Sequence, residues 1–462
     1  MPSPDRSPEA SPETSPDASR RGLTPAQPEP TWLGSGSGYL SVLALGPVLA
    51  LMAHHVWPDQ PTLRGQPLSV IAAFAAVAVA LVLWLRAGPV RPQDWPVPVR
   101  LLLATLAVLW ATTVALSVLH GDLFDLSTVL VPIALAMLWL KRPTPAAGRT
   151  ALDAWGVGII VIAVAAMALD FAGIVIIRPE GIVRWPLQVL HALGIDSRAT
   201  VPLEEIEACH ICYGYVGRWA GPFGNVNYAG PVGATLVMIG LFRPAWRRWV
   251  FTIAGLGIIV LSDSRTSLTA CLAGLVALAL AAPSILGRPV RPWFRWLVLA
   301  GLVVGVVGYI GLIDRTFNLR TDVWVEFLRT WPRSPFTGVG EHGIQALISA
   351  GDLPGWASHG HSVLVDPLLR FGVIGVVLIV AVFALLLVVT VRAARTGLVL
   401  PLVLVATALG AGLTEDLIDW RYLGLELIPL ILAAVIAADA LRASGTATRT
   451  GEPTTRLDAT GT

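Results

Sequence analysis

Residues 371–391 read FGVIGVVLIVAVFALLLVVTV, an apolar run without a charged side chain that is bounded by Arg370 and Arg392. A transmembrane helix needs roughly 20 consecutive apolar residues, so this run is long enough to cross a bilayer. The rest of the chain has the same character, because 55% of its 462 residues are hydrophobic, only 13% are charged and the mean hydropathy is +0.71. The sequence therefore predicts a multi-spanning membrane protein rather than a set of soluble domains.

Outward from this run, the sequence contains about twelve apolar stretches separated by polar loops. We expect these spans to begin near Tyr39, Leu68, Val99, Leu126, Ala151, Tyr228, Trp249, Thr266, Phe294, Val363, Leu398 and Leu423. The spans that begin at Leu126, Tyr228 and Trp249 are short, so roughly ten or eleven crossings with one re-entrant or tilted segment also fit. The predicted fold is an all-α, polytopic transmembrane helix bundle.

The short loops between the predicted spans alternate in positive charge. Every second loop is rich in basic residues, namely Arg86, Arg91, Arg100, Lys141, Arg142, Arg149, Arg243, Arg247, Arg248, Arg288, Arg291, Arg295, Arg392 and Arg395. The intervening short loops carry at most one Arg each, such as Arg64 or Arg421. Because positive charge is retained on the cytoplasmic side, we predict a cytoplasmic (inner) membrane protein with both termini in the cytoplasm.

Charge composition excludes one class of partner. The chain has 32 Lys and Arg against 30 Asp and Glu, a net charge of +2, and no basic block interleaved with aromatic residues. A nucleic-acid-binding domain normally carries such a block. We therefore expect contact with the lipid bilayer and no nucleic-acid partner.

The two ends of the chain differ from its middle. Residues 1–38 contain no apolar run and repeat a Ser-Pro pair, and residues 442–462 are rich in Thr, Gly and Ala. Neither segment can bury enough apolar surface to fold, so we expect disordered cytoplasmic tails around a transmembrane domain at 39–441. The first segment also lacks the apolar region of a signal peptide. The Ser-Pro repeats are either simply solvated or sites of phosphorylation.

Two long loops fall on the predicted outer face, at about 178–227 and 314–362. The second begins with an amphipathic stretch that we expect to be helical. The predicted spans hold few ionisable residues, mainly Asp170, Asp366, Glu426 and Asp439. An ion-coupled transporter usually needs such groups near the membrane midplane, whereas functional groups on a rigid scaffold usually lie on loops. We therefore expect the chemistry of this protein at its outer surface.

The first polar motif, RWAGPFGNVN at 218–227, ends the first long loop and opens a span. Asn225 and Asn227 either cap the next helix or bind sugar hydroxyls. The second motif, LSDSRTS at 261–267, is a polar turn between two spans. Arg265 in this turn is either an anchor for lipid phosphate or, beside serine hydroxyls such as that of Ser264, a ligand for a phosphate or diphosphate.

The third motif, RTDVW at 320–324, is followed by WPRSPFTGVG at 331–340. The prolines and glycines of this motif are explained by the structure of the loop. Arg320 is the residue here that we expect to have a functional role. The fourth motif is SHGHS at 358–362. No Cys lies nearby and no carboxylate stands at a recognisable zinc spacing, so we predict no metal site at His359 and His361. A neutral imidazole at the membrane interface is suited to accepting a proton from a hydroxyl.

Cys209 and Cys212 lie in the first outer loop, where a disulfide can persist. Their spacing fits a local disulfide, two free thiols, a redox pair or half of a metal site. Cys271 is the only other cysteine and falls in a predicted span, so a site of four thiolates is excluded.

The order of these motifs resembles the O-antigen ligase and O-antigen polymerase superfamily. The resemblance rests on GPFGNVN at 221–227, SDSR at 262–265, Arg320 with Trp324 and PFTGVG at 335–340, and His361 with Gly372 and Gly375. It implies a bundle similar to GT-C-type glycosyltransferases. It also implies a glycan donor linked to a polyprenyl (undecaprenyl) diphosphate, used on the outer face without a nucleotide sugar, a metal or another cofactor.

The resemblance also implies roles for individual residues. Arg265 and Arg320 would grip the donor diphosphate, with Arg218 as a third contact. His361 would orient or deprotonate the acceptor, since Gly372 and Gly375 keep the family's spacing of eleven and fourteen positions after the histidine. His359 does not fit that register. The remaining expected substrate-binding residues are Asn225, Asn227, Ser264 and Trp324.

The predicted reaction is attack of an acceptor hydroxyl on the anomeric carbon while the polyprenyl diphosphate leaves, with inversion of configuration. The acceptor is a glycan, a lipid or a protein, and flippase or chain-length proteins are the expected partners. The motifs do not separate a polymerase of envelope, capsule or exopolysaccharide glycan, which we favour slightly, from a ligase. The alternatives from other classes are a solute or inorganic-carbon transporter and a non-catalytic scaffold of polysaccharide assembly.

Overall fold

The structure is a computed structural model, and it describes most of the chain from Ser37 to Thr450. The described residues are 37–56, 66–87, 95–122, 126–171, 219, 221–223, 225–262, 264–286, 300–301, 314–355, 357, 359–416 and 418–450. Arg218, Cys209, Cys212 and most of the first long loop lie outside these ranges, as does most of the span expected near Phe294.

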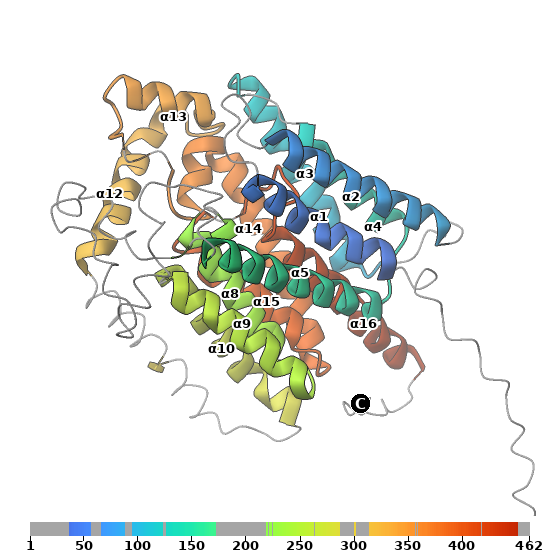
Figure 1. The fold of residues 1–462 in the computed structure, drawn as a ribbon. Coiled ribbons are helices and arrows are strands. Elements are labelled where there is room, and N and C mark those ends of the chain that lie inside the picture. Colours follow the sequence, from blue (N-terminus) through green and yellow to red (C-terminus); the bar gives the residue numbers. More distant parts are fainter. Residues whose placement is uncertain are drawn as a thin grey trace, which may run out of the picture.

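Every regular element in the described ranges is a helix, as the sequence predicts (Figure 1). The α-helices are α1 (Ser37–Val56), α2 (Gln66–Arg86), α3 (Val97–Leu119), α4 (Leu130–Leu140), α5 (Pro145–Phe171), α8 (Val226–Leu241), α9 (Ala245–Ser262), α10 (Arg265–Leu286), α12 (Asp314–Thr330), α13 (Gly340–Ser349), α14 (Val365–Arg395), α15 (Leu400–Gly412) and α16 (Leu427–Thr450). Short 3₁₀ turns are η2 (Leu126–Val129), η5 (Gly221–Phe223) and η6 (Trp331–Arg333). Outside the range near Phe294, each expected span starts within a few residues of a helix.

The apolar helices support a membrane protein. In the described residues, four segments are long and apolar enough to cross a bilayer: Val97–Leu119, Pro145–Ala168, Ala245–Ser262 and Val365–Arg395. Shorter apolar helices are Ser37–Leu51, Ile71–Arg86, Ser127–Leu140, Val226–Leu241, Arg265–Ala281 and Leu400–Gly412. Apolar side chains also lie on the outward face of the long helix α5, where Val157, Val161 and Val164 are 50%, 58% and 60% exposed. Such a stripe is unfavourable in water and favourable against lipid tails.

Close contact between small residues packs α8 against α9. A Cβ added to Gly233 would lie 2.7 Å from the carbonyl oxygen of Gly255, and one added to Gly255 would lie 2.5 Å from that of Gly233. Helices in membranes use small residues in this way, because close approach of two backbones replaces the hydrophobic driving force that lipid removes. This hairpin places the turn at 262–265 beside the start of α8, which is where two of the polar motifs meet.

The helix α3 connects two different ends of the bundle. Before its first turn, Trp95 donates from Nε1 to the carbonyl of Leu138 at 3.2 Å and lies under the guanidinium of Arg142. Beyond its last turn, Asp122 accepts from the backbone N–H of His342 in α13 at 2.8 Å. At 1.5 Å per residue, its 23 residues are about 35 Å long, close to the thickness of a bilayer.

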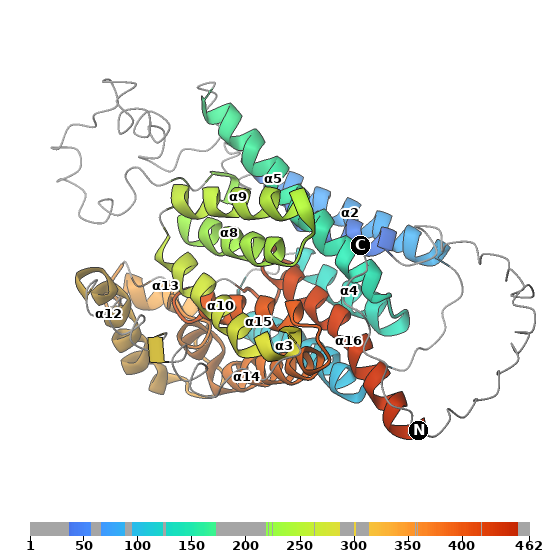
Figure 2. The ribbon, with the colours of Figure 1, turned by 90° about the horizontal axis from the view of Figure 1, so that it is seen from below.

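We call the region around Lys141 and Arg142 the basic end and the region around α12 and α13 the site end. Figures 1 and 2 agree that α12 and α13 lie together at one side of the bundle, with the final turns of α16 far from them. The second long loop is thus largely helical, with α12 where an amphipathic helix was expected. The helix α16 runs eight residues beyond Arg442, where a disordered tail was expected to begin, and the first proline after it is Pro453.

Candidate functional site

The centre of the site is Glu415, which follows α15 and whose side chain is 1% exposed. Its Oε1 lies 2.8 Å from Nδ1 of His361, and its Oε2 accepts a hydrogen bond from Nη2 of Arg320 at 2.9 Å. The Arg320 and His361 side chains are 16% and 18% exposed, so one edge of the cluster reaches the surface. Two residues that the sequence singled out are therefore brought together by a third that it did not.

The three residues come from three separate elements. Arg320 lies on α12, His361 lies in the turn before α14, and Glu415 lies just after α15. Glu415 is 54 positions from His361 and 95 from Arg320 in sequence. Packing of α12 and α15 against α14 brings them together, so the cluster exists only in the assembled bundle.

A tight turn presents the two histidines to this carboxylate. His361 has a φ of 45°, in the left-handed region that non-glycine residues rarely adopt. The preceding Gly360 accepts a hydrogen bond from Nε1 of Trp324 at 2.7 Å and donates its N–H to Oδ1 of Asp366 at 2.6 Å. Backbone strain of this kind persists only where the surroundings hold it, and it is concentrated at functional sites.

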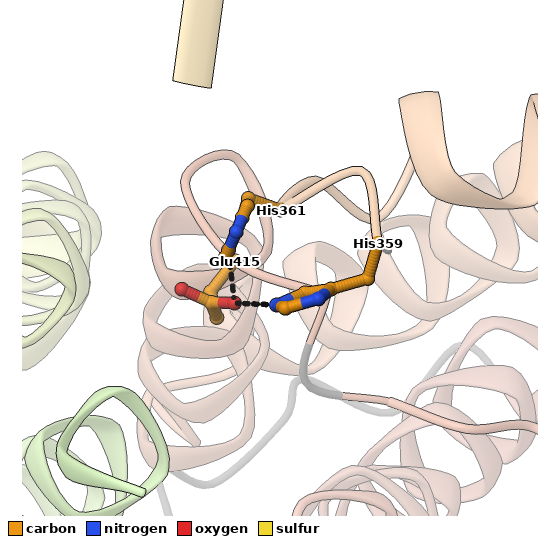
Figure 3. Close-up of side chains that lie close together, drawn as sticks. All are labelled: His359, His361 and Glu415. Carbon is orange, nitrogen blue, oxygen red and sulfur yellow. Dashed lines mark hydrogen bonds and ion pairs between the residues drawn. The ribbon is translucent and has the colours of Figure 1, made fainter. Parts of the chain in front are cut away.

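Both histidine rings reach the same carboxylate, as Figure 3 shows. Nε2 of His359 lies 3.9 Å from Oε1 of Glu415, and the centroids of the His359 and His361 rings are 3.9 Å apart. The pKa of His359 is lowered to about 4, mainly by burial and also by the neighbouring His361, against the opposing effect of Glu415. His359 is therefore neutral at pH 7.

The glycine-rich motif at 335–340 packs into a break in α14. At Gly372 the backbone has φ 65° and ψ −165°, which interrupts the helix, and Val373 then donates its N–H to the carbonyl of Pro335 at 2.9 Å. A Cβ on Gly372 would lie 2.3 Å from the carbonyl of Phe336, and one on Gly338 would lie 2.4 Å from that of Arg370. The two motifs thus form one interlocked unit that carries the histidine turn.

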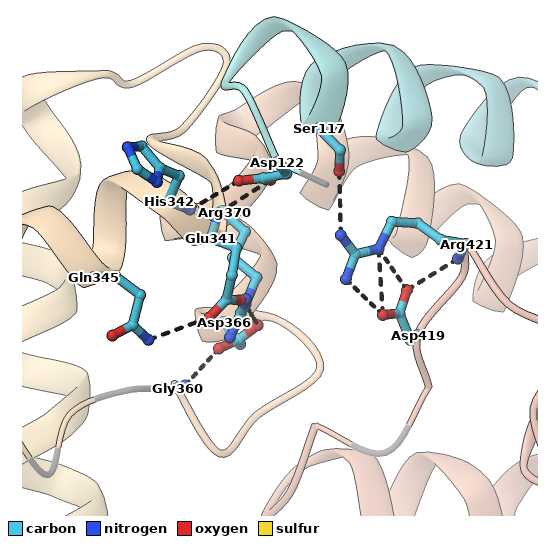
Figure 4. Close-up of polar contacts among 10 residues, drawn as sticks. All are labelled: Ser117, Asp122, Glu341, His342, Gln345, Gly360, Asp366, Arg370, Asp419 and Arg421. Atoms are coloured by element: carbon cyan, nitrogen blue, oxygen red, sulfur yellow. Dashed lines mark hydrogen bonds and ion pairs between the residues drawn. The ribbon is translucent and has the colours of Figure 1, made fainter. Parts of the chain in front are cut away.

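A second polar network lies beside this turn (Figure 4). Arg370 pairs with Asp366, which is 0% exposed, and with Glu341 on α13. Burial raises the pKa of the adjacent Asp416 above its ordinary value. In the same view, Arg421 donates to Asp419 and to Ser117 of α3. These contacts connect α3, α13, α14 and the loop after α15 next to the turn that carries the histidines.

The polar motifs at 218–227 and 261–267 contact each other at the site end of the bundle. Asn225 is the N-cap of α8, since its Oδ1 accepts from the N–H of Asn227 at 2.8 Å. Asn227 is buried, and its Oδ1 accepts a hydrogen bond from the Ser264 hydroxyl at 3.4 Å. The backbone N–H of Trp219 donates to the carbonyl of Leu261 at 2.8 Å. Capping and packing therefore account for both asparagines in the absence of a ligand.

Arg265 begins α10 and is exposed. One turn later on the same helix, the Thr269 hydroxyl lies 3.2 Å from that of Thr414, the residue before Glu415. Because residues four apart share one face of a helix, Arg265 stands on the same face of α10 as Thr269, which contacts the loop after α15. Two of the expected catalytic residues, Arg320 and His361, share a direct partner, and the third approaches the same loop from α10.

Glu415 escaped the sequence analysis, although a signal for it existed. The loop after α15 reads TEDLID at 414–419, with three carboxylates directly after an apolar span. We considered that loop only for Arg421, its basic residue. No protein-family model matches the chain, and no curated protein matches it closely enough to count.

Proposed function

We propose that this protein is a membrane glycosyltransferase of the O-antigen ligase and polymerase type. It would transfer a glycan from a polyprenyl-diphosphate-linked donor to an acceptor hydroxyl on the outer face of the cytoplasmic membrane, without a metal. The observation that supports the proposal best is the convergence of Arg320 and His361 on Glu415. An imidazole, a guanidinium and a buried carboxylate at one end of an apolar bundle suit a reaction that moves a proton and releases a diphosphate.

His361 would act as the general base. When Nδ1–H donates to Glu415, the lone pair of the imidazole stands on Nε2, where it can accept a proton from the attacking hydroxyl. The carboxylate would hold this tautomer and stabilise the imidazolium that forms, as the acid does in a Ser-His-Asp triad. This assigns Glu415 a positioning role that the sequence alone did not suggest.

The arginines would stabilise the leaving diphosphate. A guanidinium offers five N–H donors in a planar fork, more than one carboxylate oxygen uses, so Arg320 can hold Glu415 and still contact a phosphate oxygen. Arg265 is the first residue of α10, where the positive end of the helix dipole also favours an anion. Removing one such donor typically costs about 2.7–4 kcal/mol of transition-state stabilisation.

The expected orientation of the bundle in the membrane is compatible with these roles. We infer about twelve crossings, with the basic end in the cytoplasm and the site end outside. The lipid tail of the donor would then lie among the apolar helices, while its diphosphate stays at the level of the site end. The acceptor would approach from the exposed edge of His361.

The test is transfer by the full-length protein, purified in detergent and supplied with a polyprenyl-diphosphate-linked glycan extracted from the native host. We expect product with the native protein and none with His361→Ala. His342→Ala, an exposed histidine on α13, is the matched control and should retain transfer. A longer lipid-linked glycan would identify a polymerase, and glycan moved to another acceptor would identify a ligase. Equal transfer by the native protein and His361→Ala, or none by either, would refute the proposal.

A further inference from the structure

We propose that His359, His361 and Glu415 form a binding site for a zinc ion, and that zinc bound there inhibits the transfer reaction. The inhibition rests on the proposed function, because it concerns the imidazole that would act as base. The binding does not rest on it, because it follows from the ligand atoms alone.

The ligand set has the composition and spacing of a zinc site. Each of the three residues offers one ligand atom, and these atoms all lie within 4.8 Å of one another. At bond lengths of about 2.0–2.1 Å, tetrahedral zinc places neighbouring ligand atoms about 3.4 Å apart. The separations from Oε1 of Glu415, 2.8 Å to His361 and 3.9 Å to His359, lie on either side of that value. Two histidines with one glutamate and an open fourth position also form a known type of zinc site.

The surroundings hold these ligands in place. Oε2 of Glu415 accepts from Arg320, so the carboxylate that would bind zinc is itself fixed by an outer hydrogen bond. Contacts from Trp324 and Asp366 to Gly360 fix the backbone between the two histidines. Outer contacts of this kind are regular features of metal sites, because they orient the ligands before the ion arrives.

The accessibility of the ligands also favours a metal. The His359 side chain is 38% exposed, so at least one of the three ligands can be reached by an ion from the surface. The sequence did not predict this site because its third ligand is 54 positions beyond His361.

Bound zinc would prevent proton transfer by occupying His361. An imidazole whose lone pair is shared with zinc cannot accept a proton from an acceptor hydroxyl. His359 neither accepts the proton nor contacts the diphosphate in the proposed reaction. His359→Ala therefore removes a zinc ligand and leaves the proposed base and its carboxylate in place, so zinc binding and transfer can be tested separately.

The experiment measures zinc binding by untagged, full-length protein in detergent, through competition with a chromophoric chelator. We expect one zinc per chain, and binding at least about tenfold weaker in His359→Ala, since even outer-shell changes weaken metal sites by 10–100-fold. His342→Ala should bind zinc like the native protein. Cobalt should replace zinc with a visible absorption band that His359→Ala loses.

All variants are also measured with Cys209→Ser and Cys212→Ser, because that pair is a second candidate half-site. Zinc binding that disappears with the cysteines and persists in His359→Ala would overturn the proposal, as would the absence of binding by the native protein. Where transfer is observed, zinc should inhibit the native protein and not His359→Ala, and a chelator should restore activity. Zinc binding without any transfer would leave the site standing and refute the proposed function instead.

Discussion

The two ends of the bundle are both polar, but their charges are arranged differently. At the basic end, Lys141 donates from Nζ to the carbonyl of Trp84 at 3.1 Å, and Arg142 lies over the ring of Trp95 at 5.5 Å. At the site end, cations and carboxylates lie against each other, as in the pair of Arg320 with Glu415. The basic end holds cations supported by backbone and aromatic rings together with the pair of Arg243 and Asp153, whereas the site end buries a network of several carboxylates and cations.

This difference indicates what each end is for. Lysines and arginines beside tryptophans are typical of residues that anchor a helix bundle at a lipid headgroup layer. A buried ion pair is a weak source of stability, because the loss of hydration offsets much of the attraction between its charges. The cluster at Glu415 therefore needs another explanation, and the proposed chemistry supplies one. Four predictions test this contrast.

The largest expected effect is an all-or-none difference in accessibility between the two ends. In a background of Cys209→Ser, Cys212→Ser and Cys271→Ala, we introduce Ser349→Cys on α13 or Arg247→Cys on α9, both at exposed positions. A membrane-impermeant maleimide should label Ser349→Cys in intact cells, because the proposed orientation places the site end outside. It should label Arg247→Cys only after the cells are permeabilised. Labelling of both in intact cells would show that the two ends do not lie on opposite sides.

The second prediction concerns the buried carboxylate. Glu415→Gln keeps the shape of the side chain and removes the charge that would hold and stabilise the His361 imidazolium. Transfer should fall roughly 10²- to 10⁴-fold. Asp419→Asn is a change of the same kind in the same loop, but it keeps an oxygen that can accept from Arg421 and lies outside the Glu415 cluster, so its effect on transfer should be much smaller. Equal losses in the two variants would mean that the loop matters only as a structural unit.

The third prediction addresses the backbone beneath the histidines. Gly372→Ala places a methyl group against the carbonyl of Phe336 and demands a φ of 65°, so unfolding should become easier by at least about 1–3 kcal/mol. Gly257→Ala on α9 meets nothing within 4 Å and should be neutral or slightly stabilising. Thermal unfolding of the purified variants, followed by loss of the monodisperse peak in size-exclusion chromatography, measures both. Similar melting temperatures for the two variants would contradict the interlocked motifs.

The sequence predicted the helices well and the site only in part, for physical reasons. Each apolar run carries its own signal, so helix starts follow from local composition, as for the run at 371–391. The sequence showed the spacing of Gly372 from His361 but not the packing of the motif at 335–340 against the break at Gly372, because local sequence contains no information on which backbone segments approach each other. The carboxylates at 414–419 mark the loop that holds Glu415, but they do not reveal its role, since its partners come from α12 and from the turn before α14. Residues brought together by packing between distant helices are the part that local patterns miss.

The smallest expected effect on transfer belongs to the basic end. Arg142→Gln removes a buried guanidinium that lies over Trp95 and should lower stability by about 2 kcal/mol, the usual contribution of a desolvated cation–π contact. Transfer at saturating donor should stay within about twofold of the native rate, because Arg142 is separated from Glu415 by most of the length of α3. Melting temperature and transfer rate, measured on one preparation, distinguish these effects. A large loss of transfer with an unchanged melting temperature would show that the basic end takes part in the reaction, and would end the division of roles between the two ends.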